Sequence, residues 1–368
     1  MATFILRTLA RHLALVAIAA FIFTFTPNIG SSPGIAPAAA QTSGNVPGNW
    51  SGNVSDSELW FAIRKGVTGT VTIPDKKAGQ LVQSDGDELR AFRQGPMSQF
   101  GGWLLIGSLI LIGLFYVGRG RIQVDAGLSG RTIERFNAFE RFVHWLTASS
   151  FIILALTGLN MLYGKYVLPS LIGKSAFASL TMFGKFAHDW IAWAFIIGII
   201  LMFFSWVRHN IPNMVDIRWL LAGGGMFSKG VHPPAKRFNA GQKIIFWLVI
   251  VGGASLSGSG LALLFPFEIE MFAGTFKVMN QFGTNFPIEL SPIQETQYAL
   301  MWHGIMALVM IAIVIAHIYI GSVGMEGAFD AVGTGQVDIN WAKEHHNLWV
   351  QDMESMDESA VAPNRPTE

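Results

Sequence analysis

Five long runs of apolar residues limit what this chain can fold into. They cover residues 101–118, 142–163, 186–207, 244–267 and 298–324. A helix needs about 20 residues to cross the hydrocarbon core of a bilayer, so the first run is short and the others are ample. Only 13% of the residues are charged, against about a quarter in an average soluble chain. The pattern predicts an all-α integral membrane protein, a bundle of about five transmembrane helices without a large soluble catalytic domain.

The N-terminal hundred residues divide into two segments. Arg7 and Arg11 precede an apolar stretch, and a Pro/Gly/Ala-rich stretch follows that ends in three alanines before Gln41. This order is typical of a cleavable signal peptide, so we expect residues 1–40 to be removed; the alternative is an uncleaved anchor. Residues 41–100 are polar and rich in Gly, Pro and Ser. They are expected to form a small periplasmic arm, followed by an extra transmembrane helix over 101–118.

The basic residues of the connections predict the orientation in the membrane. The segments 119–141 and 208–243 carry eleven Lys and Arg together, whereas 164–187 and 268–297 carry four. Since positive loops stay in the cytoplasm, the first two segments and the C-terminus are expected there. The same count puts the N-terminal arm outside the cytoplasm, which agrees with a signal peptide. We expect a multi-pass protein of a bacterial inner membrane.

The chain has no cysteine. It therefore forms no disulfide, holds no iron–sulfur cluster or thiolate zinc site, and binds no haem covalently. Any redox chemistry must depend on His, Met, carboxylates or a non-covalent cofactor. The net charge of +1 gives no reason to expect a nucleic-acid partner.

Four of the nine histidines lie in or beside the apolar runs, where a buried ionisable group is costly and indicates function. His303 and His317 are 14 residues apart on one run, so their side chains point about 40° apart and lie about 21 Å apart along a helix. With the predicted topology, His188 lies at the outer depth of His303, and His144 at the inner depth of His317. Two imidazoles from facing helices suit the axial positions of a haem iron.

Other readings of these histidines are weaker. A zinc or copper ion would need three or four ligands at one depth, and a proton relay would need carboxylates within the helices. Helix packing through hydrogen-bonded histidines is the remaining alternative. Asp189, beside His188, either orients that imidazole or caps the interface toward water. Small residues over 252–260 permit close helix approach as well as a bulky cofactor.

Four motifs resemble the γ subunit of respiratory formate dehydrogenase, a membrane dihaem cytochrome b. They are Arg141-Phe-Val-His-Trp145, Val207-Arg-His-Asn-Ile-Pro212, Phe238-Asn-Ala-Gly-Gln-Lys243 and Trp341-Ala-Lys-Glu-His-His346. The resemblance covers about residues 130–350, which would form the dihaem domain, and leaves 351–368 as an acidic cytoplasmic tail. The spacing of His303 and His317 is shared with cytochromes b of nickel–iron hydrogenases, and the Asn-Ala-Gly-Gln-Lys stretch favours formate dehydrogenase.

The resemblance implies two b haems and a quinone site. His188 and His303 would ligate the outer haem, and His144 and His317 the inner one. Three further residues match the family's segment for ubiquinone or menaquinone: Asn239, Gly241 and Gln242. Their amides suit a quinone carbonyl that becomes more basic on reduction, although Asn239 would equally serve as a helix N-cap.

The resemblance further implies a role in a complex. An iron–sulfur β subunit would supply electrons taken from formate by a molybdenum- or tungsten-containing α subunit. Electrons would cross the membrane, with its lipids around the bundle, and reduce quinone on the cytoplasmic side. The alternatives are the cytochrome b subunit of a nickel–iron hydrogenase or related reductase, and a haem-free membrane anchor.

Overall fold

The computed structural model describes residues 86–228, 230–266 and 268–361. Contacts divide the chain into two units, Met1–Arg90 and Ala91–Glu368, and nearly all described residues belong to the second. The expected signal peptide and most of the expected arm lie outside the described residues. The described end of the arm is helical, since α3 (Gly86–Phe92) and a π-helical turn (Arg93–Met97) lead directly into α4.

Five helical spans in the described residues are long and apolar enough to cross a membrane, which confirms the predicted bundle. They contain α4 (Ser98–Arg119), α5 (Ala138–Ile172), α6 (Lys174–Trp206), α8 (Ala240–Leu264) and α10 (Pro292–Tyr319). Large apolar side chains on them are open to the surroundings: Trp103 is 71% exposed and Phe204 73%. Such surfaces are stable against lipid and not against water. The protein is therefore a multi-pass membrane protein.

Local sequence signals begin four of the described helices. Asn137, Asn213, Asn239 and Ser291 are the N-caps of α5, α7 (Met214–Leu221), α8 and α10. In each case the residue three positions later, an acidic residue or Gln, returns a side-chain hydrogen bond to the backbone of the cap. These capping boxes satisfy N–H groups that a helix start leaves free.

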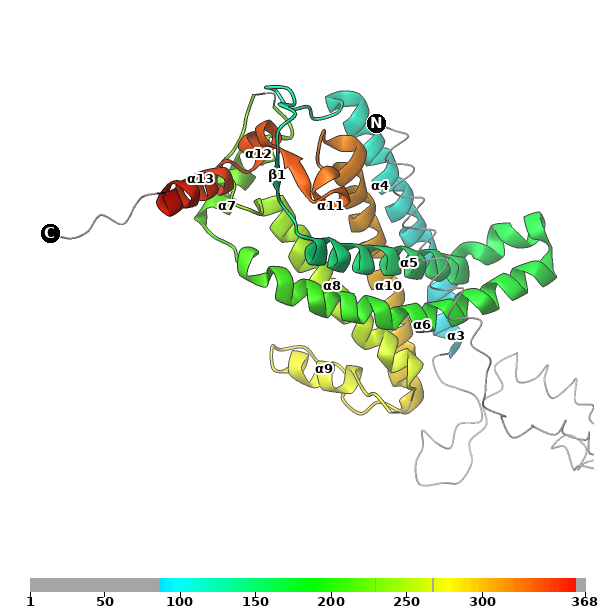
Figure 1. The fold of residues 1–368 in the computed structure, drawn as a ribbon. Coiled ribbons are helices and arrows are strands. Elements are labelled where there is room, and N and C mark those ends of the chain that lie inside the picture. The colour runs from blue at the N-terminus through cyan, green and yellow to red at the C-terminus, as the bar shows by residue number, and fades with distance from the viewer. Residues whose placement is uncertain (1–85, 229, 267, 362–368) are drawn as a thin grey trace, which may run out of the picture. The chain divides into compact units, whose positions relative to one another are not determined.

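Helices α5 and α6 form a long antiparallel hairpin (Figure 1). Only Gly173 separates them, and its φ of 83° is readily adopted by glycine alone. The predicted loop over 164–187 is thus wrong, because both helices continue through it. The 35 residues of α5 span about 52 Å, well beyond an apolar layer of about 30 Å. Helix α10 packs against α4 and α8, and α8 packs against α6.

The segments 120–137, 207–228, 230–239 and 325–361, here called the cap, gather where α5 and α8 begin (Figure 1). Strand β1 (Thr132–Glu134) pairs antiparallel with β2 (Gln336–Asp338), so a segment before α5 is joined to one after α10. Short helices α7, α11 (Asp330–Gly333), α12 (Ile339–His345) and α13 (Asn347–Val361) complete it. Helix α9 (Phe272–Asn280) lies at the opposite end of α8 and α10 (Figure 1).

The C-terminal part of the chain is more ordered than its acidic composition indicates. Val337 and Ala342 are fully buried and Trp341 is 2% exposed, so the tail contributes to the main core of the protein. Helix α13 continues to Val361, so the expected tail 351–368 begins as a helix. The rest of the expected tail, residues 362–368, lies outside the described residues.

Candidate functional site

The structure brings the four intramembrane histidines together as two pairs. His188 of α6 faces His303 of α10, with ring centres 6.2 Å apart. His144 of α5 faces His317 of α10, with ring centres 6.4 Å apart. The two histidines on α10 are separated by 14 residues, which is about 21 Å along the helix. The pairs therefore lie at two depths of the bundle.

A hydroxyl group orients each imidazole of the His188–His303 pair. Nδ1 of His188 lies 2.8 Å from Oγ1 of Thr157, and Nδ1 of His303 lies 3.0 Å from Oγ of Ser259. Each hydroxyl already donates to a carbonyl of its own helix, Thr157 to Ile153 at 2.8 Å and Ser259 to Ser255 at 3.0 Å. Each hydroxyl therefore accepts from Nδ1–H, which leaves the lone pair of each Nε2 free to bind a metal.

The His144–His317 pair has a different environment. Nδ1 of His144 is buried and has no hydrogen-bond partner among the described residues. His144 lies on the first turns of α5, close to the cap, whereas His317 lies near the end of α10. A buried nitrogen without a partner is costly and requires an explanation, such as a group that this pair binds.

The geometry of both pairs fits two axial ligands of a haem iron. A bond of about 2 Å from each imidazole nitrogen to the iron, plus about 1.2 Å from that nitrogen to its ring centre, puts opposed ring centres about 6.4 Å apart. The observed separations are 6.2 and 6.4 Å. Glycines also flank the rings: a Cβ at Gly260 would lie 3.3 Å from Cε1 of His303, and one at Gly158 3.7 Å from Cε1 of His188. The lack of side chains there leaves space beside the imidazoles.

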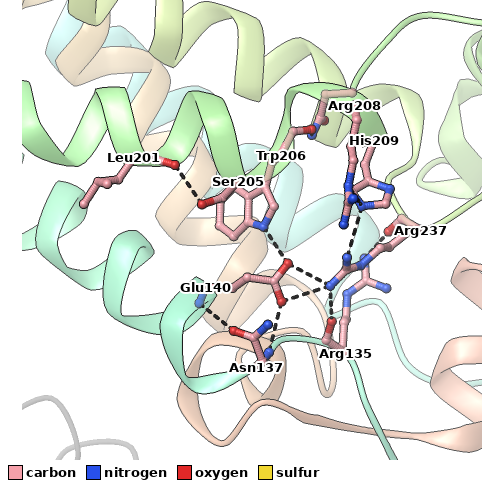
Figure 2. Close-up of polar contacts among 10 residues, drawn as sticks. Arg135, Asn137, Glu140, Leu201, Ser205, Trp206, Arg208, His209 and Arg237 are labelled. Carbon is pink, nitrogen blue, oxygen red and sulfur yellow. Dashed lines mark hydrogen bonds and ion pairs between the residues drawn. The ribbon is translucent and has the colours of Figure 1, made fainter.

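A buried ion pair fixes the start of α5, one turn before His144. Figure 2 shows the carboxylate of Glu140 between Asn137, Trp206 and Arg237. It accepts from the indole N–H of Trp206 at 2.9 Å and from the Arg237 guanidinium at 2.8 and 3.0 Å. Glu140 and Trp206 are 7% and 6% exposed. This network ties α5, the end of α6 and the segment before α8 together, and so holds the helix that carries His144.

A second buried cation organises the cap. Arg135 is 2% exposed, and its guanidinium lies over the rings of Phe136, Phe238, Trp341 and Trp349. Its Nη2 donates to the carbonyl of Arg237 at 2.6 Å and contacts Nε2 of His346 at 3.0 Å. Burial, with the nearby charge of Arg237, lowers the pKa of Arg135 to about 9. Burial and the charge of Arg135 also hold the pKa of His346 well below its usual range, so that imidazole is neutral.

The expected quinone segment forms the start of α8. Asn239 is the N-cap, and its Oδ1 accepts from the N–H of Gln242 at 2.9 Å while Gln242 Oε1 accepts from the N–H of Asn239 at 3.1 Å. Asn239 therefore has the N-cap role that the sequence offered as an alternative. Gly241 lies against Trp219, since a Cβ there would be 3.0 Å from its ring.

Two polar residues near the pairs have structural partners. Asp189 forms an ion pair with Lys185 at 2.6 Å, and the partner of His188 is Thr157. His209 lies 3.3 Å from Arg237 in the network of Figure 2. The structure thus places neither residue in a histidine pair.

The sequence alone predicts no role for Thr157, and it marks Ser259 only as one of the small residues over 252–260. The available signal was a hydroxyl within an apolar run, which is most stable when it has a hydrogen-bond partner. Which partner it has depends on helix packing, because Thr157 is 31 residues from His188 and Ser259 is 44 from His303.

Comparison with known proteins places this bundle in a family. Residues 135–332, just over half of the chain, match the family model of the prokaryotic cytochrome b561. The formate dehydrogenase cytochrome b556(fdo) subunit of Escherichia coli K12 is 29% identical over 222 residues, 60% of this chain and 93% of that protein. The nitrate-inducible cytochrome b556(Fdn) subunit of the same organism is 25% identical over 226 residues, with 61% and 93% covered. The Haemophilus influenzae cytochrome b556 subunit is 23% identical over 230 residues, with 60% and 83% covered.

These findings agree with the resemblance inferred from the motifs. A cytochrome b carries haem b without covalent attachment, which suits a chain without cysteine. The matched region also contains all four paired histidines. The chain belongs to the prokaryotic cytochrome b561 family.

Proposed function

We propose that this chain is the membrane cytochrome b subunit of a formate dehydrogenase complex, with residues 130–350 as a dihaem domain. In this role it accepts electrons from an iron–sulfur partner, carries them through two b haems and delivers them to quinone. The observation that carries the proposal is the two pairs of facing imidazoles, 6.2 and 6.4 Å apart between ring centres, at two depths of one bundle. The names of the relatives supply formate as the electron donor of the complex.

The paired histidines would hold the haems. His188 and His303 would bind the outer haem iron, and His144 and His317 the inner one. Each haem, when bound, supplies an iron that is reversibly reduced by one electron. Thr157 and Ser259 accept the Nδ1–H groups of the outer pair, which fixes the tautomer and ring orientation required for binding through Nε2.

Quinone would bind at the start of α8, where Asn239, Gly241 and Gln242 lie. Their support in the structure is chemical: the side-chain oxygens of Asn239 and Gln242 accept hydrogen bonds in the capping box, so the amide N–H groups are the part of each side chain that would donate to a quinone. A donor stabilises the negative charge that builds up on a quinone oxygen during reduction. Either ubiquinone or menaquinone would accept such hydrogen bonds through its carbonyl oxygens.

The distribution of basic residues supports the proposed location and orientation. With eleven Lys and Arg in 119–141 and 208–243, against four in the opposite connections, the cap would lie in the cytoplasm of a bacterial cell, beneath the inner membrane. The arm 41–100 would be periplasmic, after removal of residues 1–40 and ahead of the extra transmembrane helix at 101–118. Quinone would then be reduced on the cytoplasmic side, after electrons have crossed the membrane inward.

The proposed partners supply chemistry that this chain lacks. Its sequence has no cysteine to hold an iron–sulfur cluster, and its described residues form membrane helices and the cap, without a large soluble domain for formate oxidation. An iron–sulfur β subunit and a molybdenum- or tungsten-containing α subunit would provide both. The test is to purify the chain from its native membrane in mild detergent and identify the subunits that accompany it. Formate-dependent reduction of its haem supports the proposal, whereas reduction by hydrogen alone with a hydrogenase partner would replace it.

A further inference from the structure

Three potential metal ligands from distant parts of the sequence converge in the cap. Asp125 precedes β1, His232 lies between α7 and α8, and Glu344 lies on α12. Each offers one ligand atom, and the three atoms lie within 4.8 Å of one another. Oδ2 of Asp125 and Nε2 of His232 are already 3.1 Å apart. This cluster is separate from the four histidines within the membrane helices and has no part in the function proposed above.

Backbone hydrogen bonds hold both carboxylates in place. The two oxygens of Glu344 accept from the N–H groups of Asp125 at 2.9 Å and Ala126 at 2.8 Å. Oδ2 of Asp125 accepts from the N–H of Gly230 at 3.0 Å. The carboxylate of Glu344 is thus fixed beside that of Asp125, although two negative charges repel each other at such a distance. A cation between them would remove this repulsion.

A fourth ligand is available beside the cluster. The ring centres of His345 and His232 are 6.3 Å apart, and Nε2 of His345 is buried without a hydrogen-bond partner among the described residues. A buried polar atom that lacks a partner costs about 1–3 kcal/mol. The side chains of Asp125 and His232 are 45% and 31% exposed, so an ion can enter from solvent.

We propose that Asp125, His232 and Glu344 bind a divalent transition-metal ion of the zinc type, with His345 as the fourth ligand. Carboxylate oxygens and imidazole nitrogens together are typical ligands of Zn²⁺, whereas Mg²⁺ and Ca²⁺ prefer oxygen ligands alone. Ligands of a tetrahedral ion with bonds of about 2.1 Å lie about 3.4 Å apart. The ligand atoms of Asp125, His232 and Glu344 lie within 4.8 Å of one another, so small side-chain rotations bring these three to that spacing. The ion would join three segments of the cap and stabilise it from the solvent side.

Zinc binding by the haem-loaded chain tests this directly. The chain is purified in detergent without a polyhistidine tag, treated with a chelator, and titrated with ZnCl₂ in a calorimeter, with zinc then counted by mass spectrometry. We expect one Zn²⁺ per chain, with affinity at least about tenfold weaker in Asp125→Asn and His232→Gln. Glu354→Gln is the matched control, since Glu354 belongs to an exposed pair with Lys343 outside the cluster. It should bind Zn²⁺ as the wild type does.

Two results would overturn the proposal. One is a wild-type chain that binds no zinc, or that releases it to an equal concentration of Mg²⁺. The other is binding by both cluster variants with wild-type affinity, which would leave Asp125 and His232 as an ordinary surface ion pair. An unchanged haem absorption spectrum in each variant shows that the membrane bundle is intact. A loss of zinc binding is then assigned to the cluster and not to misfolding.

Discussion

Nδ1 of His188 and Oγ1 of Thr157 lie 2.8 Å apart, and the hydroxyl in turn donates to the carbonyl of Ile153. Ser259 and His303 repeat this arrangement across the pair at 3.0 Å. In each case a hydroxyl group held by its own helix therefore fixes the orientation of an imidazole on a neighbouring helix. A binding site for a haem iron requires this kind of support, because a ligand that rotates freely loses binding energy when it is ordered.

Thr157→Val should weaken the outer haem site without changing the fold. Valine has the shape of threonine but cannot accept the Nδ1–H of His188, so we expect haem dissociation about 10- to 100-fold faster. The midpoint potential of this haem should rise, because an imidazole without its acceptor is a weaker donor to ferric iron. Haem transfer to apomyoglobin and a redox titration measure both. Thr157→Ser keeps the hydroxyl and should match the wild type; equal losses in both variants would contradict this role.

Variants of the paired histidines should separate the two haems. His188→Ala, His303→Ala and the double variant should each retain one haem per chain, because loss of either axial ligand removes the same haem. His144→Ala and His317→Ala should likewise lose one haem, and the potentials of the remaining haem should differ between the two groups of variants. The number of haems per chain is measured by haem extraction, and the midpoint potential of the remaining haem by redox titration. Two haems per chain in His303→Ala would show that the pairing of His188 with His303 as haem ligands is wrong.

Asn239 allows capping to be separated from quinone binding. Asn239→Asp keeps the oxygen that caps α8 but removes the amide donor, so thermal stability should stay unchanged. Quinone reduction should slow about tenfold, the factor that corresponds to about 1.4 kcal/mol for one hydrogen bond. Asn239→Ala removes both the capping oxygen and the amide donor, so it should slow quinone reduction and also lower the free energy of unfolding by about 1 kcal/mol. Wild-type kinetics in Asn239→Asp, measured with a soluble quinone analogue, would leave Asn239 as a cap only.

The sequence predicts the membrane helices well because their signal is local. Four of the five apolar runs fall within a helical span of the structure, and the fifth, 244–267, begins within α8 and passes its end at Leu264. Asn239 is recognisable as a cap from its own neighbours. The region 164–187 was predicted as a loop because hydropathy marks where the apolar residues end. Hydropathy does not mark where a helix ends, and α5 and α6 continue as helices around Gly173.

The cap was beyond sequence reasoning for a different reason. Its stability depends on contacts between segments about 200 residues apart, such as Arg135 with His346 and β1 with β2. The local pattern of an acidic, polar C-terminal segment does not indicate which distant segment of the chain it contacts. The facing of His144 and His317 was predictable from depth and helix period. The roles of Thr157 and Ser259 required the relative rotation of two helices.

Loss of Glu140 should destabilise the protein strongly. Its carboxylate is buried against Arg237 and Trp206, and removal of one partner from a buried pair costs about 3–5 kcal/mol. We expect Glu140→Ala to lose stability on this scale in denaturant unfolding. Asp189→Asn removes the partner of an exposed lysine and should cost about 0–1 kcal/mol. Similar losses in both variants would show that the Glu140 network is not the anchor of α5.

The buried His346 should make the cap sensitive to acid. Its pKa is well below the ordinary 6.5 because of burial and the charge of Arg135. Below pH 6.5 the unfolded chain therefore binds a proton that the folded chain does not. This contribution to stability is present above the unfolded pKa and falls by up to about 1.4 kcal/mol per pH unit as the pH drops below it. Unfolding between about pH 5 and 7.5, with a chelator present, should be less pH-dependent in His346→Gln; an unchanged slope would exclude this residue.

The haem content of the purified chain tests the central claim most directly. A dithionite-reduced minus oxidised spectrum in detergent, with haem extracted and counted per chain, needs no assumption about partners or substrate. Two histidine pairs predict two b-type haems per chain, resolved as two steps in a redox titration. A folded preparation that takes up no haem, or only one when haem is supplied in excess, would contradict the dihaem account.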